Sequence, residues 1–228
     1  MVKVIRHPFP VRIANALSSL LARLRDATQH DHHCLDRHPR LRRLLQRDLD
    51  RHGYADSLAG LHGAQSSLEE AVRLGLEQQR ISPSDSEGYR LDARTPALRD
   101  DLARLGGKPS DEAVIPMAVP RRLETLIGLL YVLEGSRLGA RVIARHVRAS
   151  LGPAAPLRFF AEADGAAHWP SFVAFAERAV REDEFAEQAA LGARAAFALF
   201  HHSLDASPAA MRLDDRVASP LVSLEGAK

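Results

Sequence analysis

The amino-acid sequence predicts an all-α fold in a single compact, multi-helix domain. The chain has 228 residues, a length that suits one large domain with a substantial core. Alanine, leucine and arginine are plentiful, and aromatic residues make up only 5% of the chain, a composition that favours helices over strands. Apolar residues recur three and four positions apart, and no stretch alternates convincingly with the period of two typical of strands. These observations predict roughly eight helices.

Proline, glycine and polar clusters divide the chain into its elements. In order, the expected helices cover residues 11–38, 40–51, 55–79, 95–102, 121–150, 157–162, 169–181 and 184–204. Pro39 is expected to end the first helix and Gly53 to stop the second. Pro96 suits the first position of the short fourth helix, and Gly152 follows the longest one. The polar segment 82–88 predicts a loop.

We expect one domain over residues 1–205, with an extended N-terminus over 1–10, because no repeat or long linker divides the chain. Residues 206–228 have little periodicity and predict a poorly ordered tail. The 31 Lys and Arg residues nearly balance the 29 Asp and Glu residues, which argues against a nucleic-acid partner. The most apolar stretch, 127–133, is far too short to span a membrane. The single cysteine, Cys34, cannot form an internal disulfide, so we expect a cytoplasmic protein.

Three histidines and a cysteine gather near the end of the first expected helix: His30, His32, His33 and Cys34. On a helical wheel, the apolar stripe of this helix consists of Ile13, Leu17, Leu20, Leu21, Leu24, Ala27, Thr28 and Leu35. His32 lies about 60° from the centre of the stripe, whereas His30 and His33 lie about 140° and 160° away, toward solvent. Because imidazole binds metals and haem iron, His32 is the histidine placed to serve a pocket beside this helix.

Other interpretations of this segment stay open. A histidine at the edge of a buried stripe can simply be a packed, hydrogen-bonded side chain. His30, Cys34 and His38 have a workable i, i+4 spacing for zinc, although they lack the clustered framework of structural zinc sites. Asp31 projects near the middle of the apolar stripe, where an unpaired carboxylate is costly. It therefore needs a buried partner or a bend in the helix.

The longest expected helix carries three glycines on one face. Gly128, Gly135 and Gly139 are spaced i, i+7 and i+11, and each costs roughly 1 kcal/mol relative to alanine inside a helix. Either another helix crosses closely there, or the helix backbone approaches something flat and bulky. The spacing alone leaves both explanations open. Ser136, beside Gly135, could add a hydroxyl to a ligand pocket.

Together, these two segments resemble the haem oxygenase family, especially the bacterial biliverdin-producing enzymes associated with bacteriophytochromes. Residues 24–36 look like the family's proximal helix, in which the histidine four residues after a threonine is the axial haem ligand; the match falls on His32. Residues 131–139 are similar to the distal helix, whose glycines let the backbone lie over the haem. Weaker similarities extend over most of the chain. Ala140 departs from the second glycine of many members.

The resemblance implies an enzyme that uses dioxygen and electrons to cleave haem to biliverdin, free iron and carbon monoxide. It also implies haem as both substrate and cofactor, a ferredoxin or other reductant as electron donor, and a bacteriophytochrome as receiver of the biliverdin. From the charge balance and the lack of a long apolar stretch we expect no nucleic-acid or membrane partner. The alternative is a non-enzymatic haem carrier or sensor with the same fold. A thiaminase-like enzyme of this general fold is a third candidate, which would leave haem unbound.

The same resemblance implies a set of site residues. His32 would bind the iron, and the residues that hold haem would be His32, Arg25, Thr28, Gly135 and Gly139. The catalytic positions on the distal side would be Gly135, Ser136 and Gly139. Further candidates for pairing with the haem propionates, which cannot be ranked from sequence, are Arg137, Arg141, Arg178 and Arg194.

Overall fold

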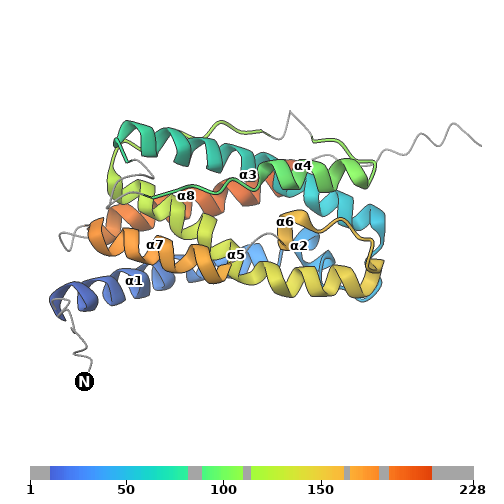
Figure 1. Cartoon of the computed structure of the whole chain (residues 1–228), viewed down its shortest axis with the longest axis horizontal. Coiled ribbons are helices and arrows are strands. Elements are labelled where there is room, and N and C mark those ends of the chain that lie inside the picture. The colour runs from blue at the N-terminus through green and yellow to red at the C-terminus, as the bar shows by residue number, and fades with distance from the viewer. Residues whose placement is uncertain (1–10, 82–88, 110–113, 162–164, 180–184, 207–228) are drawn as a thin grey trace, which may run out of the picture.

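Helices make up nearly all of the regular structure in the computed structural model, which describes residues 11–81, 89–109, 114–161, 165–179 and 185–206. Within these ranges there are eight helices and no strand, so the predicted all-α class is confirmed (Figure 1). They are α1 (Val11–Asp36), α2 (Pro39–Arg43), α3 (Arg51–Gln78), α4 (Thr95–Arg104), α5 (Leu123–Leu151), α6 (Arg158–Ala161), α7 (Gly165–Ala179) and α8 (Phe185–Ala206). The expected N-terminal extension, the loop 82–88 and the tail 207–228 lie outside the described residues, as do the side chains of Ile13 and Leu17.

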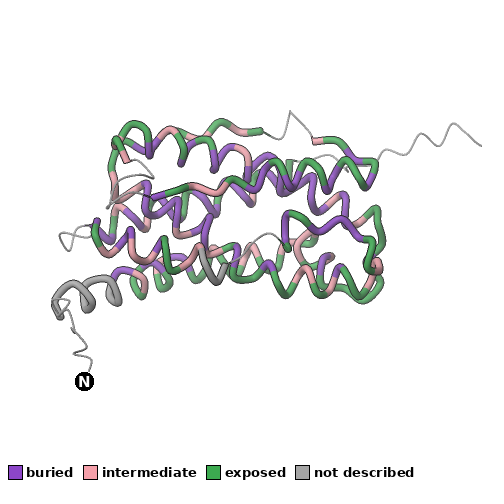
Figure 2. The backbone as a smooth tube through the Cα atoms, in the orientation of Figure 1, coloured by how far each residue is buried: buried purple, intermediate pink, exposed green. Residues whose placement is uncertain are grey.

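Helix α8 lies at the centre of the helix packing, since it contacts α1, α3 and α5. Buried residues follow the inward faces of α3, α5 and α8 (Figure 2). The core is built mainly from leucine, alanine and phenylalanine, with Leu24, Leu58, Leu133 and Phe172 fully buried. This close-packed apolar interior supplies the main driving force for folding. None of the described helices has the length and apolarity that a bilayer crossing demands.

Two glycines allow α5 and α8 to cross with their backbones nearly in contact. A Cβ added to Gly128 of α5 would lie 1.9 Å from the backbone oxygen of Ala189. A Cβ added to Gly192 of α8 would lie 2.4 Å from the backbone oxygen of Thr125. Real Cβ atoms do not approach backbone so closely, so only glycine fits at either position. The close-crossing explanation of the glycine row therefore holds for Gly128.

The predicted stop of the second helix was wrong. Helix α2 ends at Arg43, and Gly53 lies in the first turn of α3 rather than after the end of a helix. The Asp50 side chain caps α3 by accepting a 2.8 Å hydrogen bond from the Gly53 N–H. A Cβ on Gly53 would also lie 2.7 Å from Nε of Arg43. Arg43 is a long side chain that can move, so the contact favours a small residue at this helix start without requiring glycine.

We expect Asp50→Ala to lower the free energy of unfolding by about 1 kcal/mol at neutral pH, the usual value of a helix cap. The Gly53 N–H, helped by Arg43, holds the pKa of Asp50 below its ordinary range. The stabilisation is therefore complete above the unfolded-state pKa and is lost as the pH falls through the folded-state pKa. Denaturant unfolding at several pH values measures it. A stability difference that persisted unchanged below about pH 3 would contradict the role of an ionised cap.

Candidate functional site

A cavity of about 760 Å³ opens between α1 and α5. Its walls are mainly apolar, and they include six aromatic residues: Tyr131, Phe159, Phe160, Trp169, Phe197 and Phe200. The polar side chains that reach it are Arg25, His32, Asp36, Gln65, Arg94 and Ser136. A concave apolar site with a few convergent polar groups is typical of a pocket for a small molecule or cofactor.

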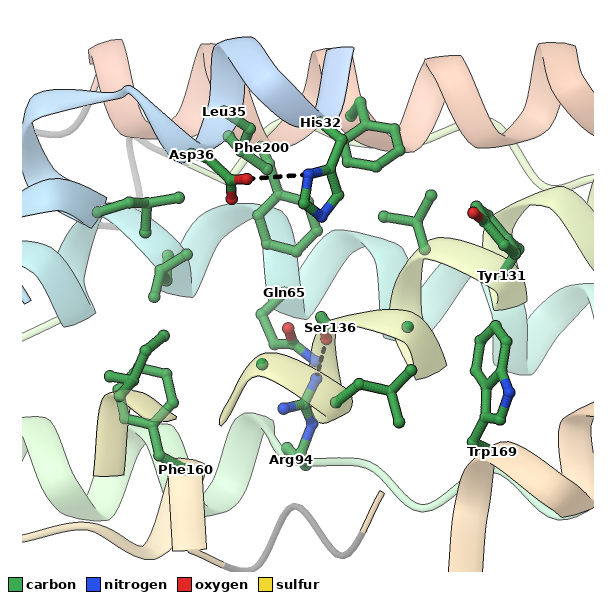
Figure 3. A pocket seen from close by; sticks show the side chains of 18 of the residues that line it. His32, Leu35, Asp36, Gln65, Arg94, Tyr131, Ser136, Phe160, Trp169 and Phe200 are labelled. Atoms are coloured by element: carbon green, nitrogen blue, oxygen red, sulfur yellow. Dashed lines mark hydrogen bonds and ion pairs between the residues drawn. The ribbon is translucent and has the colours of Figure 1, made fainter. Parts of the chain in front are cut away.

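His32 projects from α1 into this cavity, and its side chain is 65% exposed, so a ligand in the cavity can reach the ring (Figure 3). Its Nδ1 lies 3.0 Å from Oδ2 of Asp36, one turn later on the helix. The ring packs edge-on against Phe197, with the centroids 5.9 Å apart. A carboxylate on Nδ1 favours the tautomer that carries its proton there, which leaves the Nε2 lone pair free toward the cavity. This arrangement suits a histidine that coordinates a metal.

The neighbouring histidines do not line the cavity. His30 and His33 are exposed on α1, as the helical wheel predicted. Nε2 of His30 lies 3.5 Å from Sγ of Cys34, but His38 turns away to Asp205 of α8, at 3.1 Å. The three residues considered for zinc are therefore not gathered into one site. Across the described residues, no group of three or more metal-ligating side chains is found.

Asp31, which the wheel left without a partner, lies opposite an arginine of another helix. Its Oδ2 is 3.9 Å from Nε of Arg194 on α8, and its side chain is only 33% exposed. The same Nε donates a 3.0 Å hydrogen bond to the backbone oxygen of Ala27. A half-buried carboxylate facing a cation resolves the apparent conflict with the apolar stripe. It also gives Arg194 a role other than pairing with a ligand in the cavity.

Thr28, which the family resemblance assigned to the haem-binding residues, lies behind the cavity wall. This residue is buried and does not line the cavity. Its hydroxyl donates a 2.7 Å hydrogen bond to the backbone oxygen of Leu24 and also bonds with Tyr131, which does line the cavity. Burial raises the pKa of the Tyr131 phenol, and this outweighs the lowering effects of Thr28 and Arg25. Thr28 therefore supports the wall of the cavity, whereas Arg25 belongs to its lining.

Two glycines of α5 expose helix backbone to the cavity. A Cβ added to Gly139 would meet nothing within 4 Å, and one added to Gly135 would meet only Cζ3 of Trp169, at 3.7 Å. Both residues line the cavity across from α1. The second explanation of the glycine row, an approach of backbone to a flat ligand, therefore fits Gly135 and Gly139. Within the glycine row, Gly128 therefore serves helix packing, whereas Gly135 and Gly139 form an open surface of backbone, here called the cradle, in the cavity wall.

A buried arginine lies beside Ser136 in the part of the cavity wall that faces His32 (Figure 3). Arg94 is only 3% exposed, and its Nη2 donates a 2.6 Å hydrogen bond to Oγ of Ser136. The Ser136 hydroxyl in turn donates to the backbone oxygen of Leu133, at 2.7 Å. The Arg94 guanidinium also lies over the ring of Phe159, 4.8 Å from its centroid. It is therefore held between an aromatic face and the hydroxyl of α5.

A carboxylate of α3 holds the backbone that carries this arginine. Glu69 accepts hydrogen bonds from the backbone N–H of Arg94 at 2.6 Å and of Thr95 at 3.1 Å, and from the Thr95 hydroxyl at 2.6 Å. Gln65, which lines the cavity, donates to the same carboxylate at 2.6 Å. Burial, and next the repulsion of Arg137, lower the pKa of Arg94 to about 10. Arg94 therefore stays cationic at neutral pH.

Comparison with known proteins assigns the family. The family model described as "Heme oxygenase" matches residues 18–206. A heme oxygenase of Xanthomonas campestris is 37% identical over 165 residues, which cover 72% of this chain and 95% of that protein. The chain belongs to the haem oxygenase family. It is accordingly an enzyme that degrades haem, and haem is its substrate and ligand.

Solved haem oxygenase structures share the fold. The NO- and CO-bound enzyme of Neisseria meningitidis aligns with a TM-score of 0.61 at 23% identity, over 85% of this chain and 96% of that one. The cyanobacterial enzyme of Synechocystis, solved in complex with haem, aligns with a TM-score of 0.59 at 16% identity, over 82% of this chain and 90% of that one. At these identities the likeness shows the fold alone.

The residues present fit a haem. A free imidazole nitrogen enters the cavity from α1, open glycine backbone lines it on α5, and aromatic and aliphatic side chains form much of the wall between. Such surroundings suit a flat, largely apolar macrocycle with one iron coordination position supplied by histidine. Sequence reasoning did not single out Arg94 and Gln65, which both line this cavity. An arginine just before a helix gives no signal of its own, because only the fold brings it to α5.

Proposed function

We propose that haem would bind between α1 and α5, held through its iron by His32, and that this chain cleaves haem to biliverdin, iron and carbon monoxide. The observation that carries the proposal is the alignment of the free Nε2 of His32 with a cavity whose opposite wall is the open backbone at Gly135 and Gly139. Bound haem supplies the chemistry of dioxygen activation through its iron. The protein's task is to hold, orient and enclose it.

On the side of α1, Asp36 keeps the His32 ring in one tautomer and one orientation. The 3.0 Å contact with Nδ1 favours one orientation of the ring and makes the imidazole a stronger ligand. Arg25, about two turns before His32, lines the cavity as a cation suited to a propionate. None of the four other arginines considered for this role, Arg137, Arg141, Arg178 and Arg194, is among the lining residues.

On the side of α5, Arg94 supplies the hydrogen-bonding capacity. The Ser136 proton is already committed to the backbone oxygen of Leu133, so Ser136 has no further proton to donate. Arg94 keeps a buried Nε that finds no hydrogen-bond partner among the described residues. A buried donor of this kind, next to a cavity, is suited to order a water molecule. We therefore add Arg94 to the site, as the group that holds water and protons near the reacting edge.

Two further features of the proposal rest on the family resemblance: a ferredoxin or other reductant as electron donor, and a bacteriophytochrome as receiver of the pigment. The proposed cytoplasmic location rests on the single cysteine, Cys34. Reduction assays with a panel of ferredoxins test the electron donor. Pull-down of the pigment-loaded protein with a biliverdin-free phytochrome tests the receiver of the pigment.

The direct test of the proposed function is a turnover experiment. Purified protein is mixed with one equivalent of haem, and ascorbate or a reduced ferredoxin is then added in air. We expect the Soret band to disappear while biliverdin absorption grows and one equivalent of carbon monoxide forms. A stable Soret band with no pigment would support the haem carrier instead. Failure to bind haem at all would contradict the proposed occupancy of the cavity.

We expect Arg94→Met to slow the single-turnover cleavage of bound haem by about 10- to 100-fold, the usual effect of losing one charged hydrogen bond. Methionine keeps the apolar length of the side chain, so haem affinity should change less than about threefold. Stopped-flow spectra of the haem complex and a haem titration measure the two quantities. Arg94→Lys, which preserves a positive charge near Ser136 and Phe159, serves as the matched control. An unaltered cleavage rate in Arg94→Met would remove Arg94 from the site.

A further inference from the structure

Arg137 is a fully buried charge that the proposed mechanism does not use. It lies on α5 next to Ser136, is 0% exposed, and does not line the haem cavity. Its Nε is 2.8 Å from Oε2 of Glu134, one turn earlier on the same helix. Its Nη1 is 3.5 Å from Oδ2 of Asp92, and its Nη2 donates a hydrogen bond to the backbone oxygen of that residue. The solvent-excluded guanidinium of Arg137 thus lies between the Glu134 carboxylate and the backbone of a segment distant in the chain.

The segment that Arg137 holds, residues 89–94, is irregular and runs up to the start of α4. Among the described residues, no backbone-to-backbone hydrogen bond involves positions 89–93. Side chains hold the segment instead. The Tyr89 hydroxyl donates to Oε1 of Glu134 at 2.7 Å, and the Arg94 N–H donates to Glu69. Because the ladder of a helix or sheet is missing, these side-chain contacts determine where the segment lies.

The contacts close a ring on α5. Arg137 donates a hydrogen bond to the backbone oxygen of Asp92, and Arg94 lies two residues later in the chain. The Arg94 side chain in turn donates a hydrogen bond to Ser136, the residue before Arg137 on α5. The ring therefore has two anchors on one helix and a short piece of backbone between them. A shift of Asp92 away from α5 moves the Arg94 guanidinium relative to Ser136 and the cavity.

We propose that Arg137 is a positioning residue for the haem reaction, which sets the place of Arg94 by holding Asp92 against α5. The inference rests on the proposed function for the role of Arg94, but the ring of contacts exists without haem. Other ionisable groups around it are Glu134 on α5 and His168 of α7, whose Nε2 lies 3.3 Å from Oδ2 of Asp92. Glu134 and His168 lie close to Arg137 and Asp92 respectively, and neither lines the haem cavity.

The test uses Arg137→Lys in the full chain. Lysine keeps a positive charge beside Glu134 and so preserves the electrostatic influence on Arg94, but it has no planar fork with which to reach Asp92 as well. We expect single turnover to slow by about 5- to 10-fold with haem affinity unchanged. We also expect the midpoint of the acid-to-alkaline spectral transition of the ferric haem complex to rise by about half a pH unit, because a displaced cation stabilises negative charge less well.

A double-mutant cycle separates positioning from a general loss of stability. If Arg137 acts through Arg94, then Arg137→Lys has no further effect on the midpoint or the rate in an Arg94→Met background. Arg40→Lys is the matched control, since Arg40 grips the carboxylate of Asp56 and the backbone oxygen of Leu204 in the same way, outside the cavity. It should lower the melting temperature and leave the spectral midpoint unchanged.

Two results would overturn the proposal: additive effects in the cycle, or an Arg137→Lys protein that, like the control, changes only in melting temperature. If Arg137→Lys fails to fold, Tyr89→Phe releases the other end of the segment while all buried charges remain. It should also raise the midpoint, by a smaller amount, and an unchanged midpoint would count against the inference.

Hydrogen exchange of the Arg94 guanidinium, followed by NMR in haem-free protein, tests positioning even if the proposed function fails. Faster exchange in Arg137→Lys is expected, and equal exchange would contradict it.

Discussion

We expect His32→Ala to weaken haem binding by more than about 100-fold and to abolish turnover. Losing a group that merely orients a metal ligand already costs about 10- to 100-fold, and here the ligand itself is removed. The free Nε2 in the cavity would be replaced by a methyl group, and no other histidine lines the cavity in the described part of the chain. Haem titration and the absorption spectrum of the ferric complex measure the loss.

Matched variants are available on the same helix turn. His33→Ala and His30→Ala remove exposed imidazoles that do not line the cavity, so both should bind haem as the unaltered protein does. Added imidazole should restore the histidine-type spectrum to His32→Ala, because the space left by the side chain opens to the cavity. A normal spectrum in His32→Ala together with its loss in His33→Ala would show that the ligand is assigned wrongly.

We expect alanine at the two ends of the glycine row to have opposite effects. Gly128→Ala should destabilise the fold by about 3 kcal/mol or more, because the new Cβ meets the backbone of α8 and not a side chain that can move. Gly139→Ala should leave the haem-free protein as stable or up to about 1 kcal/mol more stable, since alanine is the better helix former and nothing lies within 4 Å. Thermal unfolding of haem-free protein compares the two.

The effects on haem should be the reverse. Gly139→Leu, which fills the cradle with a branched side chain, should weaken haem binding by about 10-fold or more while the haem-free fold persists. Gly128→Ala, wherever it remains folded, should bind haem in the usual way because Gly128 is outside the cavity lining. If Gly139→Leu bound haem with normal affinity, backbone at this position would not face the macrocycle.

Periodicity accounts for much of what could be predicted. It gave the all-α class and most helix positions, and on α1 it separated His32 from His30 and His33, since one helix places side chains around its axis by geometry alone. Periodicity was a weaker guide to where short helices end and to what a buried side chain contacts. The stop at Gly53 was wrong, because α2 already ends at Arg43 and Gly53 lies in the first turn of α3. The ligand contact of Thr28 stays a prediction, while the structure shows its hydroxyl bonded to its own helix.

The sequence by itself determined which residues share a face, and with the family motifs this was enough to nominate His32, Gly135 and Gly139. Only the tertiary structure decided what each face meets. It divided one glycine row into a helix crossing at Gly128 and an open cradle farther along, and it brought Arg94 to the cavity from a distant segment. The physical reason is that spacing along a helix is a local property, whereas burial, pairing and cavity shape depend on contacts between elements far apart in the chain.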